Sequence, residues 1–426
     1  MAVPGYHDSP WPGEDGGPLR SQVTGSAFET GPAGGATEVT FREAPAATMA
    51  VLRDPGEVYL LRHGFGPGAV SWVEQIDPVS LEPLARSIDL AGGPTWPGGL
   101  AAHANGSLYV VFGNHAHRLS ADLDVIVTRR LPRDKPYNSF VIMPDGHLAT
   151  KDFGGVLPGQ DPSSLVEEPC ELLVLDPESL EMRGHCELPE PSIARLSADG
   201  ATVYVVGTSA LWRVRWDGRS LSLDTGFEGR YRVMEGQTYG WDPVLALGAA
   251  WFLDNGYGSE RYVGTFRGQG VNTAPLHLVR VDLESGRVSL TEICGLPGGV
   301  VANPPLIDEE RRIALGYDSG NGVLAAFDIE FDGTLLPRWQ RDQNHACHML
   351  LFGSTGDVLT TDHDPGRMAD QFVVLDIESG EERLRVDSGS PLQSVLFPSP
   401  GWTGDALLCS FAGIARLHPQ GPSDTK

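Results

Sequence analysis

Four aspartates of this sequence recur in the same local setting, directly after a short apolar segment. They are Asp152, Asp254, Asp318 and Asp362, in the contexts TKDF, FLDNG, GYDSG and TTDHD. Each follows an earlier polar residue, by 14, 12, 15 and 14 residues in turn; these earlier residues are Asn138, Asp242, Asn303 and His348. Asn and Asp oxygens are ligands that Ca²⁺ prefers, whereas a histidine favours a transition metal. The pattern predicts a divalent cation, with Ca²⁺ as first choice and a transition metal as second.

The aspartates also have a structural interpretation, in which each accepts bonds from backbone amides at the end of a strand. The earlier residues of the pairs are harder to explain by packing, because the neck of a narrow channel accepts small or apolar side chains. We therefore predict Asn138, Asp242, Asn303 and His348 as metal ligands and keep both interpretations open for the aspartates.

Histidines concentrate in one stretch of the chain. The segment NHACH contains His345 and His348, and the same repeat ends in Asp362, His363 and Asp364. A histidine beside carboxylates can act as a general base near neutral pH. The predicted acid–base residues are His345, His348, His363, Asp362, Asp152 and Lys151. Alternatively, Lys151 forms an ion pair with Asp152, or His345 and His348 join His103 or His147 around a softer metal.

The elements that must position these residues form an internal repeat. An apolar strand that ends in aspartate and a turn occurs five times, at Asp77, Asp176, Asp282, Asp328 and Asp376. The gaps of 99, 106, 46 and 48 residues are close to one or two multiples of a period near 48. In two copies the turn reads Asp-x-x-Ser-Gly, in which side chains bond the local backbone and Gly takes the positive φ.

An apolar hairpin precedes each of these turns, as in NSFVIMPDGHLATKD (138–152) and HMLLFGSTGDVLTTD (348–362). We count eight such hairpins, so each repeat carries four short antiparallel strands, which is typical of a β-propeller. The last repeat (393–419) supplies about three strands, and the segment TEVTFRE (37–43) is predicted to add the fourth and close the ring. Seven blades is the second choice, and separate β-sandwiches are the alternative architecture.

Propeller geometry brings the predicted site together. The start of an innermost strand and the end of its hairpin partner lie at the same end of a blade, so the polar pairs should meet at one mouth of the channel. The long segments 154–169 and 256–275 follow two of the aspartates and should lie on that face. Long loops in compact repeats are often functional, and we expect 256–275 to cover the mouth.

Three segments resemble the senescence-marker-protein, gluconolactonase and strictosidine-synthase-like propellers. They are YNSFVIMPDGHLATKDF, VANPPL around Asn303, and REAPAAT with Glu43. In that superfamily a Glu, two Asn and an Asp hold a calcium ion that polarises a lactone or ester carbonyl. The resemblance implies that Glu43, Asn138, Asn303 and Asp242 take these roles.

Composition excludes several classes of protein. Of 426 residues, 53 are Gly and 33 Pro, which disfavours a mainly helical fold, and 41% are hydrophobic, which excludes wholesale disorder. The net charge of −25 repels nucleic acid and anionic membranes, so neither is an expected partner. Five scattered cysteines and a start without a signal sequence predict reduced thiols and a cytoplasmic location. We expect a flexible leader (1–36), one propeller domain (37–420) and a tail (421–426).

These observations predict a metal-dependent propeller enzyme, a hydrolase or lyase-like catalyst, that acts on a small oxygenated molecule at the channel mouth. One alternative is a quinoprotein-like oxidoreductase, since eight blades suit a flat pyrroloquinoline quinone over the axis, although the chain lacks a vicinal Cys pair. The other alternative is a non-catalytic platform for a protein partner.

Overall fold

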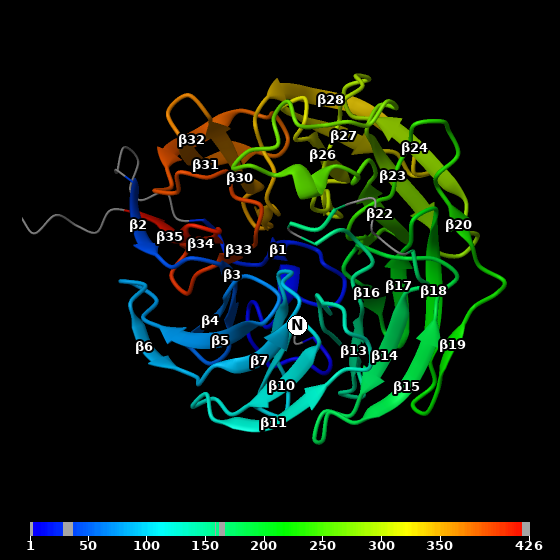
Figure 1. Ribbon diagram of the computed structural model, residues 1–426. Coiled ribbons are helices and arrows are strands. Elements are labelled where there is room, and N and C mark those ends of the chain that lie inside the picture. The colour runs from blue at the N-terminus through cyan, green and yellow to red at the C-terminus, as the bar shows by residue number, and fades with distance from the viewer. Residues whose placement is uncertain (1–2, 29–36, 158, 162–166, 420–426) are drawn as a thin grey trace, which may run out of the picture.

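Eight small antiparallel sheets surround a central axis in the computed structural model, which describes residues 3–28, 37–157, 159–161 and 167–419 (Figure 1). The predicted eight-bladed propeller is thus confirmed, and the count of seven is excluded. From the axis outward, blades 1 to 4 are β3(Ala47–Leu52)–β4(Val58–His63)–β5(Ala69–Ile76)–β6(Pro83–Arg86), β8(Gly99–Ala102)–β9(Leu108–Phe112)–β10(His115–Leu119)–β11(Val125–Arg130), β12(Val141–Ile142)–β13(Leu148–Lys151)–β14(Glu171–Leu175)–β15(Met182–Glu187) and β16(Ser197–Asp199)–β17(Thr202–Val206)–β18(Ala210–Trp216)–β19(Leu221–Leu223).

The second half of the ring repeats this order. Blades 5 to 8 are β21(Val244–Ala246)–β22(Ala249–Leu253)–β23(His277–Asp282)–β24(Val288–Glu292), β25(Leu306–Asp308)–β26(Ile313–Asp318)–β27(Val323–Ile329)–β28(Leu335–Asp342), β29(Leu350–Phe352)–β30(Asp357–Asp364)–β31(Ala369–Asp376)–β32(Glu382–Asp387) and β33(Pro398–Pro400)–β34(Ala406–Cys409)–β35(Gly413–Pro419)–β2(Thr37–Glu43). Two extra strands, β7(Leu90–Gly93) and β20(Gly229–Arg230), pair with β5 and β18.

The predicted closure of the ring is also present. Strand β2 pairs with β35 in antiparallel register from Thr37 opposite Pro419 to Glu43 opposite Gly413. The last blade is therefore built from both ends of the described propeller, so unfolding of either end opens the ring.

Local turn chemistry explains why the strands stop where they do. In the outer hairpin of blade 3, Oδ1 of Asp176 accepts bonds from the backbone amides of Glu178 (3.0 Å) and Ser179 (2.9 Å). These amides and the nearby Arg183 outweigh partial burial and lower the pKa of Asp176 to about 2. Asp77 and Asp376 bond backbone amides in the same way in blades 1 and 7. Asp77, Asp176 and Asp376 are thus turn-forming groups, whereas Asp328 accepts a bond from the side chain of Arg338.

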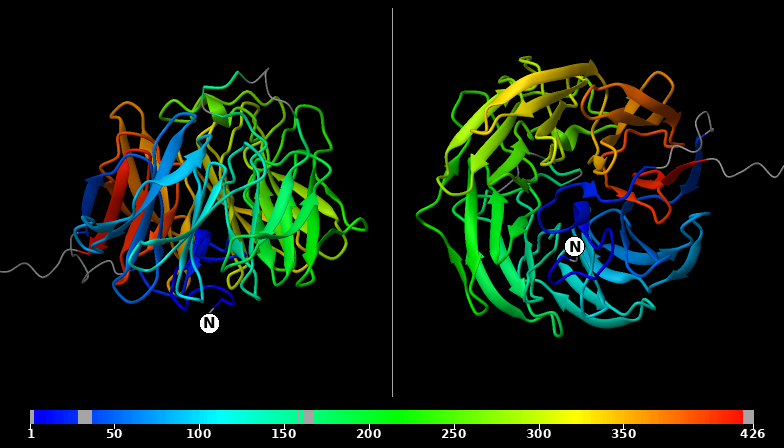
Figure 2. Two further views of the ribbon diagram at one scale, coloured as in Figure 1. Left: turned by 60° about the horizontal axis from the view of Figure 1, so that its bottom comes forward. Right: turned by 180° about the vertical axis from the view of Figure 1, so that it is seen from behind.

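Residues 3–28 pass through the middle of the ring, and this differs from the expected flexible leader. Tyr6 and Trp11 are buried, as are Arg20 and Gln22. The short strand β1(Val23–Thr24) pairs in parallel with β29 of blade 7. The N-terminus lies at the bottom of the side view in Figure 2 and in the middle of the ring when the molecule is seen from behind. The aromatic side chains anchor this segment because their apolar surface is removed from water.

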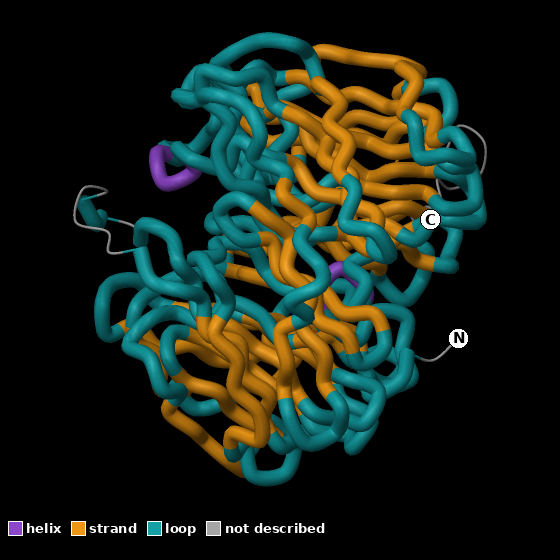
Figure 3. The backbone as a smooth tube through the Cα atoms, turned by 90° about the vertical axis from the view of Figure 1, so that its right-hand side faces the viewer, coloured by secondary structure: helices purple, strands orange, loops and turns teal. Residues whose placement is uncertain are grey.

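The two 3-10 helices within the described ranges lie at different depths of the molecule. Helix η1(Glu14–Gly16) belongs to the N-terminal segment, and η3(Ser259–Arg261) belongs to the long insertion in blade 5. Figure 3 shows one helix deep in the molecule, toward the face of the N-terminus, and the other among loops at the opposite face. None of the helices in the described ranges is long and apolar enough to cross a membrane. All five cysteines are free and fall within these ranges.

Candidate functional site

A cavity of about 330 Å³ is lined by residues that precede the innermost strands of blades 4 to 7 and by residues of η3. Its polar wall comes from the innermost strands: Arg195, Asp242 and His348 each lie two residues before the first strand of blades 4, 5 and 7. Asn303 precedes the first strand of blade 6 by three residues. The repeat of the fold therefore places these four side chains at one level of the channel, as the sequence predicted for three of them.

The floor of the cavity is built around the buried guanidinium of Arg195. Nη1 donates to Oε2 of Glu14 (3.0 Å) and to the backbone oxygens of Gly98 (3.2 Å) and Asn138, and Nη2 donates to the backbone oxygen of Pro97 (3.0 Å). The planar face of the guanidinium lies 4.8 Å from the ring centroid of Phe397. A buried charge is tolerated when it is hydrogen-bonded on this scale.

Below Arg195, the N-terminal segment contributes a second buried cation. The Arg20 guanidinium donates to Oε2 of Glu14 (2.6 Å), Oδ2 of Asp15 (3.0 Å), Oγ of Ser139 (2.7 Å) and the backbone oxygen of Leu196 (2.9 Å). Burial alone lowers the pKa of Arg20, but the neighbouring carboxylates outweigh burial and raise it above its ordinary value. The guanidinium thus ties the segment to blades 3 and 4.

Asp15 reaches His348, one of the two histidines that line the cavity; the other is His63. Its Oδ1 lies 2.9 Å from Nδ1 of His348, and both side chains are 1% exposed. The two atoms are not aligned for a hydrogen bond, so the contact is electrostatic. Burial raises the pKa of Asp15, but His348 and Arg20 outweigh burial and hold it below the ordinary value. Stacking on Phe397, at a centroid distance of 3.9 Å, fixes the imidazole plane and leaves Nε2 as the nitrogen available to a ligand.

Asp242 and Asn303 supply oxygen atoms on the wall. Oδ1 of Asp242 accepts from the backbone amide of Arg195 (2.6 Å), and Oδ2 lies 3.9 Å from Nε of that residue. Nδ2 of Asn303 donates to the backbone oxygens of Ala346 (2.5 Å) and Val395 (3.0 Å). Both amide protons of Asn303 are thus used by the fold, and its oxygen is the group left to meet a ligand.

Aromatic side chains form the upper wall, which we call the aromatic wall. The indole rings of Trp96 and Trp241 are inclined by only 14° to each other, with centroids 6.4 Å apart. The wall consists of Phe65, Trp96, Trp241, Tyr262, Phe266, Phe397 and Phe411. Tyr262 belongs to the insertion 256–275, and its hydroxyl donates to the backbone oxygen of Gln393 (2.6 Å). The insertion thus covers part of the cavity, as the sequence predicted for the mouth of the channel.

The four aspartates at strand ends are committed to the backbone. In each of them Oδ1 accepts a hydrogen bond from a backbone amide. Asp152 accepts from Glu171 (2.6 Å) and Asp254 from His277 (2.7 Å). Asp318 accepts from Val300 (3.3 Å) and Asp362 from Asn344 (2.8 Å). Asp152 and Asp362 are further paired with Arg133 and Arg385. These contacts match the structural interpretation, and none of the four lines the cavity.

Other predicted acid–base residues lie behind the wall. Nζ of Lys151 donates to the backbone oxygens of Asp152 (2.9 Å) and Ser192 (3.1 Å), and burial lowers the pKa of this lysine. His345 is fully buried against Tyr317, and burial lowers its pKa to about 3. His363 faces Asp370 with Nδ1 3.8 Å from Oδ1. Of the predicted catalytic set, only His348 lines the cavity.

The predicted metal ligands are not all brought together. Asp242, Asn303 and His348 share the cavity, but Asn138 is buried outside it, with Nδ2 donating to the backbone oxygen of Ile193 (3.3 Å). Glu43 ends the outermost strand of blade 8 and is exposed, so the role implied by the resemblance does not fit its position. No group of three or more His, Cys, Asp or Glu side chains in the described part of the chain could hold a metal ion.

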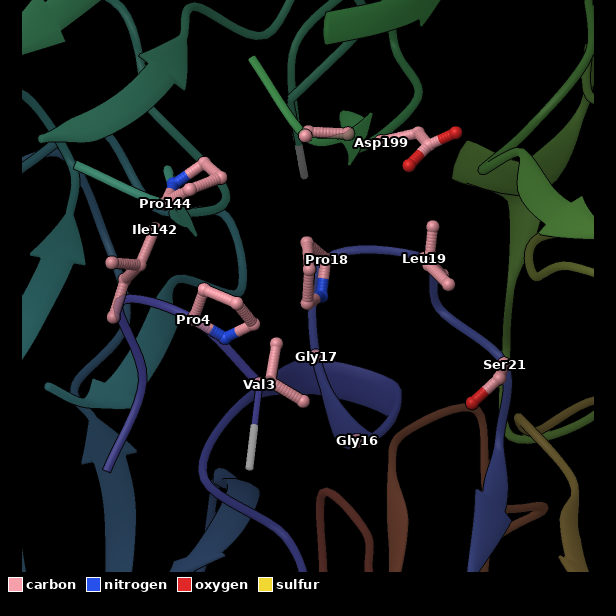
Figure 4. A pocket seen from close by; sticks show the side chains of 12 residues that line it. Val3, Pro4, Gly16, Gly17, Pro18, Leu19, Ser21, Ile142, Pro144 and Asp199 are labelled. Atoms are coloured by element: carbon pink, nitrogen blue, oxygen red, sulfur yellow. The ribbon is translucent and has the colours of Figure 1, made fainter. Parts of the chain in front are cut away.

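A second cavity, of about 420 Å³, lies where the N-terminal segment meets the hairpin turns of blades 3 and 4 (Figure 4). Its wall is largely apolar, with Val3, Pro4, Leu19 and Ile142, and Asp199 is its one acidic lining residue. It contains no histidine, cysteine or lysine among its lining residues, so the axial cavity is the better candidate for chemistry.

Sequence reasoning missed Arg195 and the whole contribution of the N-terminal segment. Arg195 interrupts the apolar start of an inner hairpin, SIARLSADG, and this was a usable signal. Within the Gly- and Pro-rich leader, Tyr6 and Trp11 were the corresponding signal, because large aromatic side chains are costly to leave in water.

Comparison with known proteins agrees with the fold and adds no family. No family model matches the sequence, and no curated protein matches it. Among solved structures, quinohemoprotein alcohol dehydrogenase from Comamonas testosteroni is similar over 98% of this chain and 82% of its own (TM-score 0.62, 10% identity). The Dos1 propeller is similar over 91% of this chain and 95% of its own (TM-score 0.58, 10% identity). BamB from Moraxella catarrhalis is similar over 88% of this chain and 100% of its own (TM-score 0.55, 12% identity). At these identities the likeness extends to the propeller fold alone.

Proposed function

We propose that the chain is an enzyme that acts on a small oxygenated molecule in the axial cavity, with His348 as the group that transfers the proton. The observation that carries this proposal is the contact of 2.9 Å between His348 and the buried carboxylate of Asp15. A carboxylate on one side of an imidazole stabilises the protonated ring, and the other nitrogen then exchanges a proton with the ligand.

Hydrolysis of an ester or lactone is the reaction that this arrangement supports best. Nε2 of His348 accepts a proton from water while the water oxygen adds to the carbonyl carbon. The imidazolium then returns this proton to the leaving oxygen as the bond from that oxygen to the carbonyl carbon breaks.

The role of a divalent cation is a separate part of the hypothesis. Asp242 and Asn303 offer oxygen atoms in the cavity, but Ca²⁺ takes six to eight oxygen ligands. Asn138 and Glu43, which were to complete the set, do not line the cavity. The donor set therefore fits a calcium ion poorly, and our proposal assigns proton transfer to His348 without a metal.

A quinone-dependent oxidoreductase is the second candidate. The nearly parallel indoles of Trp96 and Trp241 favour a flat ring system, and the quinohemoprotein alcohol dehydrogenase has the same fold. A pyrroloquinoline quinone carries three carboxylates, however, and the guanidinium of Arg195 is already engaged by Glu14 and backbone oxygens. Because Asp242 and Glu260 also line the cavity, the residues present do not fit an anionic cofactor.

A panel of small esters and lactones tests the proposal, with acid release followed in a pH-stat. We expect turnover by the wild-type protein and a loss of about 100-fold or more in His348→Gln, the range that general acid–base catalysis contributes. The control is His185→Gln, which changes a histidine on β15 whose side chain is 42% exposed, and should leave turnover unchanged. Turnover that persists in His348→Gln, or a wild-type protein inactive on the whole panel, contradicts the proposal.

A further inference from the structure

Two carboxylates line the axial cavity at different heights. Asp242 precedes the innermost strand of blade 5, and Glu260 belongs to η3 in the insertion that covers part of the cavity. Oε2 of Glu260 accepts from the backbone amide of Gly258 (3.1 Å), and Oε1 lies 3.9 Å from Nε of the exposed Arg261. Oδ2 of Asp242 receives no hydrogen bond from a described residue. Each carboxylate therefore keeps an oxygen that a ligand can meet.

The cations near the cavity are already neutralised. Arg195 is bound by Glu14 and three backbone oxygens, so little of its hydrogen-bonding capacity remains for a ligand. Together with Asp242 and Glu260, Arg195 leaves these charged lining groups with one net negative charge. Around the cavity, the charges of Glu14 and Asp15 are balanced by those of Arg20 and of Arg261, which pairs with Glu260. The two lining carboxylates thus favour a positively charged ligand.

The aromatic wall acts in the same direction. The faces of aromatic rings attract cations through the ring quadrupole, and the attraction grows when water is excluded. Trp96 and Trp241 present nearly parallel rings, and Phe397 already stacks against the Arg195 guanidinium at 4.8 Å. The net charge of −25 of the whole chain also draws cations toward the surface.

From this combination we infer that the ligand of the axial cavity is an organic cation, a small ammonium compound with an apolar body. The inference rests on the proposed function, because it names the substrate class for the same cavity. The ammonium group is held by the aromatic wall with Asp242 or Glu260, and the oxygenated group reaches His348.

Matched probes separate charge from shape. Three probes of similar size differ in charge: choline is positive, 3,3-dimethylbutan-1-ol is neutral and 3,3-dimethylbutanoate is negative. We expect calorimetry and quenching of tryptophan fluorescence to show that choline binds at least about tenfold more tightly than the alcohol. Glu260→Gln and Asp242→Asn should each weaken choline by roughly fivefold or more and leave the alcohol little changed. Trp241→Leu should weaken choline similarly.

The matched control is Glu228→Gln, which removes an exposed carboxylate paired with Arg230 outside the cavity and should leave choline binding unchanged. Because all three probes are compared on the wild-type protein, the result does not depend on how a variant folds. Binding of the alcohol or the acid as tight as that of choline overturns the cation inference and leaves the proposed hydrolase standing. Absence of choline binding also overturns it, whereas the hydrolase proposal is judged on His348→Gln.

Discussion

Oδ1 of Asp15, from the N-terminal segment, lies 2.9 Å from Nδ1 of His348, which precedes the first strand of blade 7. The backbone of Asp15 has a φ of 52°, a left-handed conformation that costs energy for a residue with a Cβ. Arg20 holds the other carboxylate oxygen at 3.0 Å. A strained backbone and a buried cation thus fix a carboxylate against the imidazole, which is the arrangement expected of a positioning residue.

Replacement of Asp15 by Asn tests this positioning role. The amide keeps an oxygen for Arg20 but removes the charge beside His348. We expect kcat for ester hydrolysis to fall by about tenfold or more, since part of the contribution of the proton-transfer group is lost. KM should change little, because Asp15 does not line the cavity. Equal changes in KM and kcat, or an unchanged kcat, would argue that Asp15 serves only the fold.

Arg20 is expected to be the main electrostatic anchor of the N-terminal segment. Arg20→Met leaves the carboxylates of Glu14 and Asp15 buried without their shared cation. Breaking a buried pair in this way costs about 3–5 kcal/mol, so the urea midpoint should drop clearly. Arg230→Met, which breaks the exposed pair with Glu228, should change the free energy of unfolding by no more than about 1 kcal/mol. A stability of Arg20→Met equal to that of wild type would contradict the anchoring role.

The fold was predictable from the sequence because its signals are local. Each blade has its own inner hairpin, and five of the eight also carry the aspartate turn, so repeated copies of a short-range pattern specify the architecture. The site depends on register and on distant segments. In blade 7 four residues separate β29 from β30, but in blade 4 only two separate β16 from β17. The residue eight positions before the turn glycine is therefore His348 in blade 7 but Ser192 in blade 4, where the channel has Arg195 instead. The bonds of Arg20 to blades 3 and 4 have no counterpart in any repeat.

The buried Asp370 carries an opposite pH dependence to that of Asp15. Oδ2 accepts from the amide of Ser394 (3.1 Å), while Oδ1 faces His363 at 3.8 Å without a hydrogen bond. Burial raises the pKa of Asp370 well above 3.8, and the charge of Asp362 acts in the same direction. A carboxyl whose pKa is raised by folding contributes stability below its unfolded pKa, and this contribution is lost as pH rises through the folded value.

Asp370→Asn should therefore gain stability relative to wild type as pH rises. We expect a difference near zero at about pH 4 and more than about 1 kcal/mol at pH 8, since one pKa unit corresponds to about 1.4 kcal/mol. Urea unfolding followed by tryptophan fluorescence measures the difference across this range. Asp332→Asn is the control, because hydrogen bonds from Thr334 lower the pKa of that exposed aspartate and the trend should be reversed. A variant less stable than wild type at pH 8 would contradict this account.

Calcium provides the last test, because the sequence-based hypothesis and the geometry make different predictions. Asp242, Asn303 and Glu260 are the lining side chains with carboxylate or amide oxygens, and these are fewer than the six to eight oxygen ligands of Ca²⁺, so we expect EDTA to leave ester turnover and the melting temperature unchanged. A ligand that binds only the folded state raises its stability, so a bound ion would make the melting temperature rise with added CaCl₂. The double variant Asn138→Ala, Asn303→Ala identifies the site of any such rise. A calcium-dependent rise in wild type that disappears in this variant would restore the metal to the mechanism and overturn proton transfer by His348 alone.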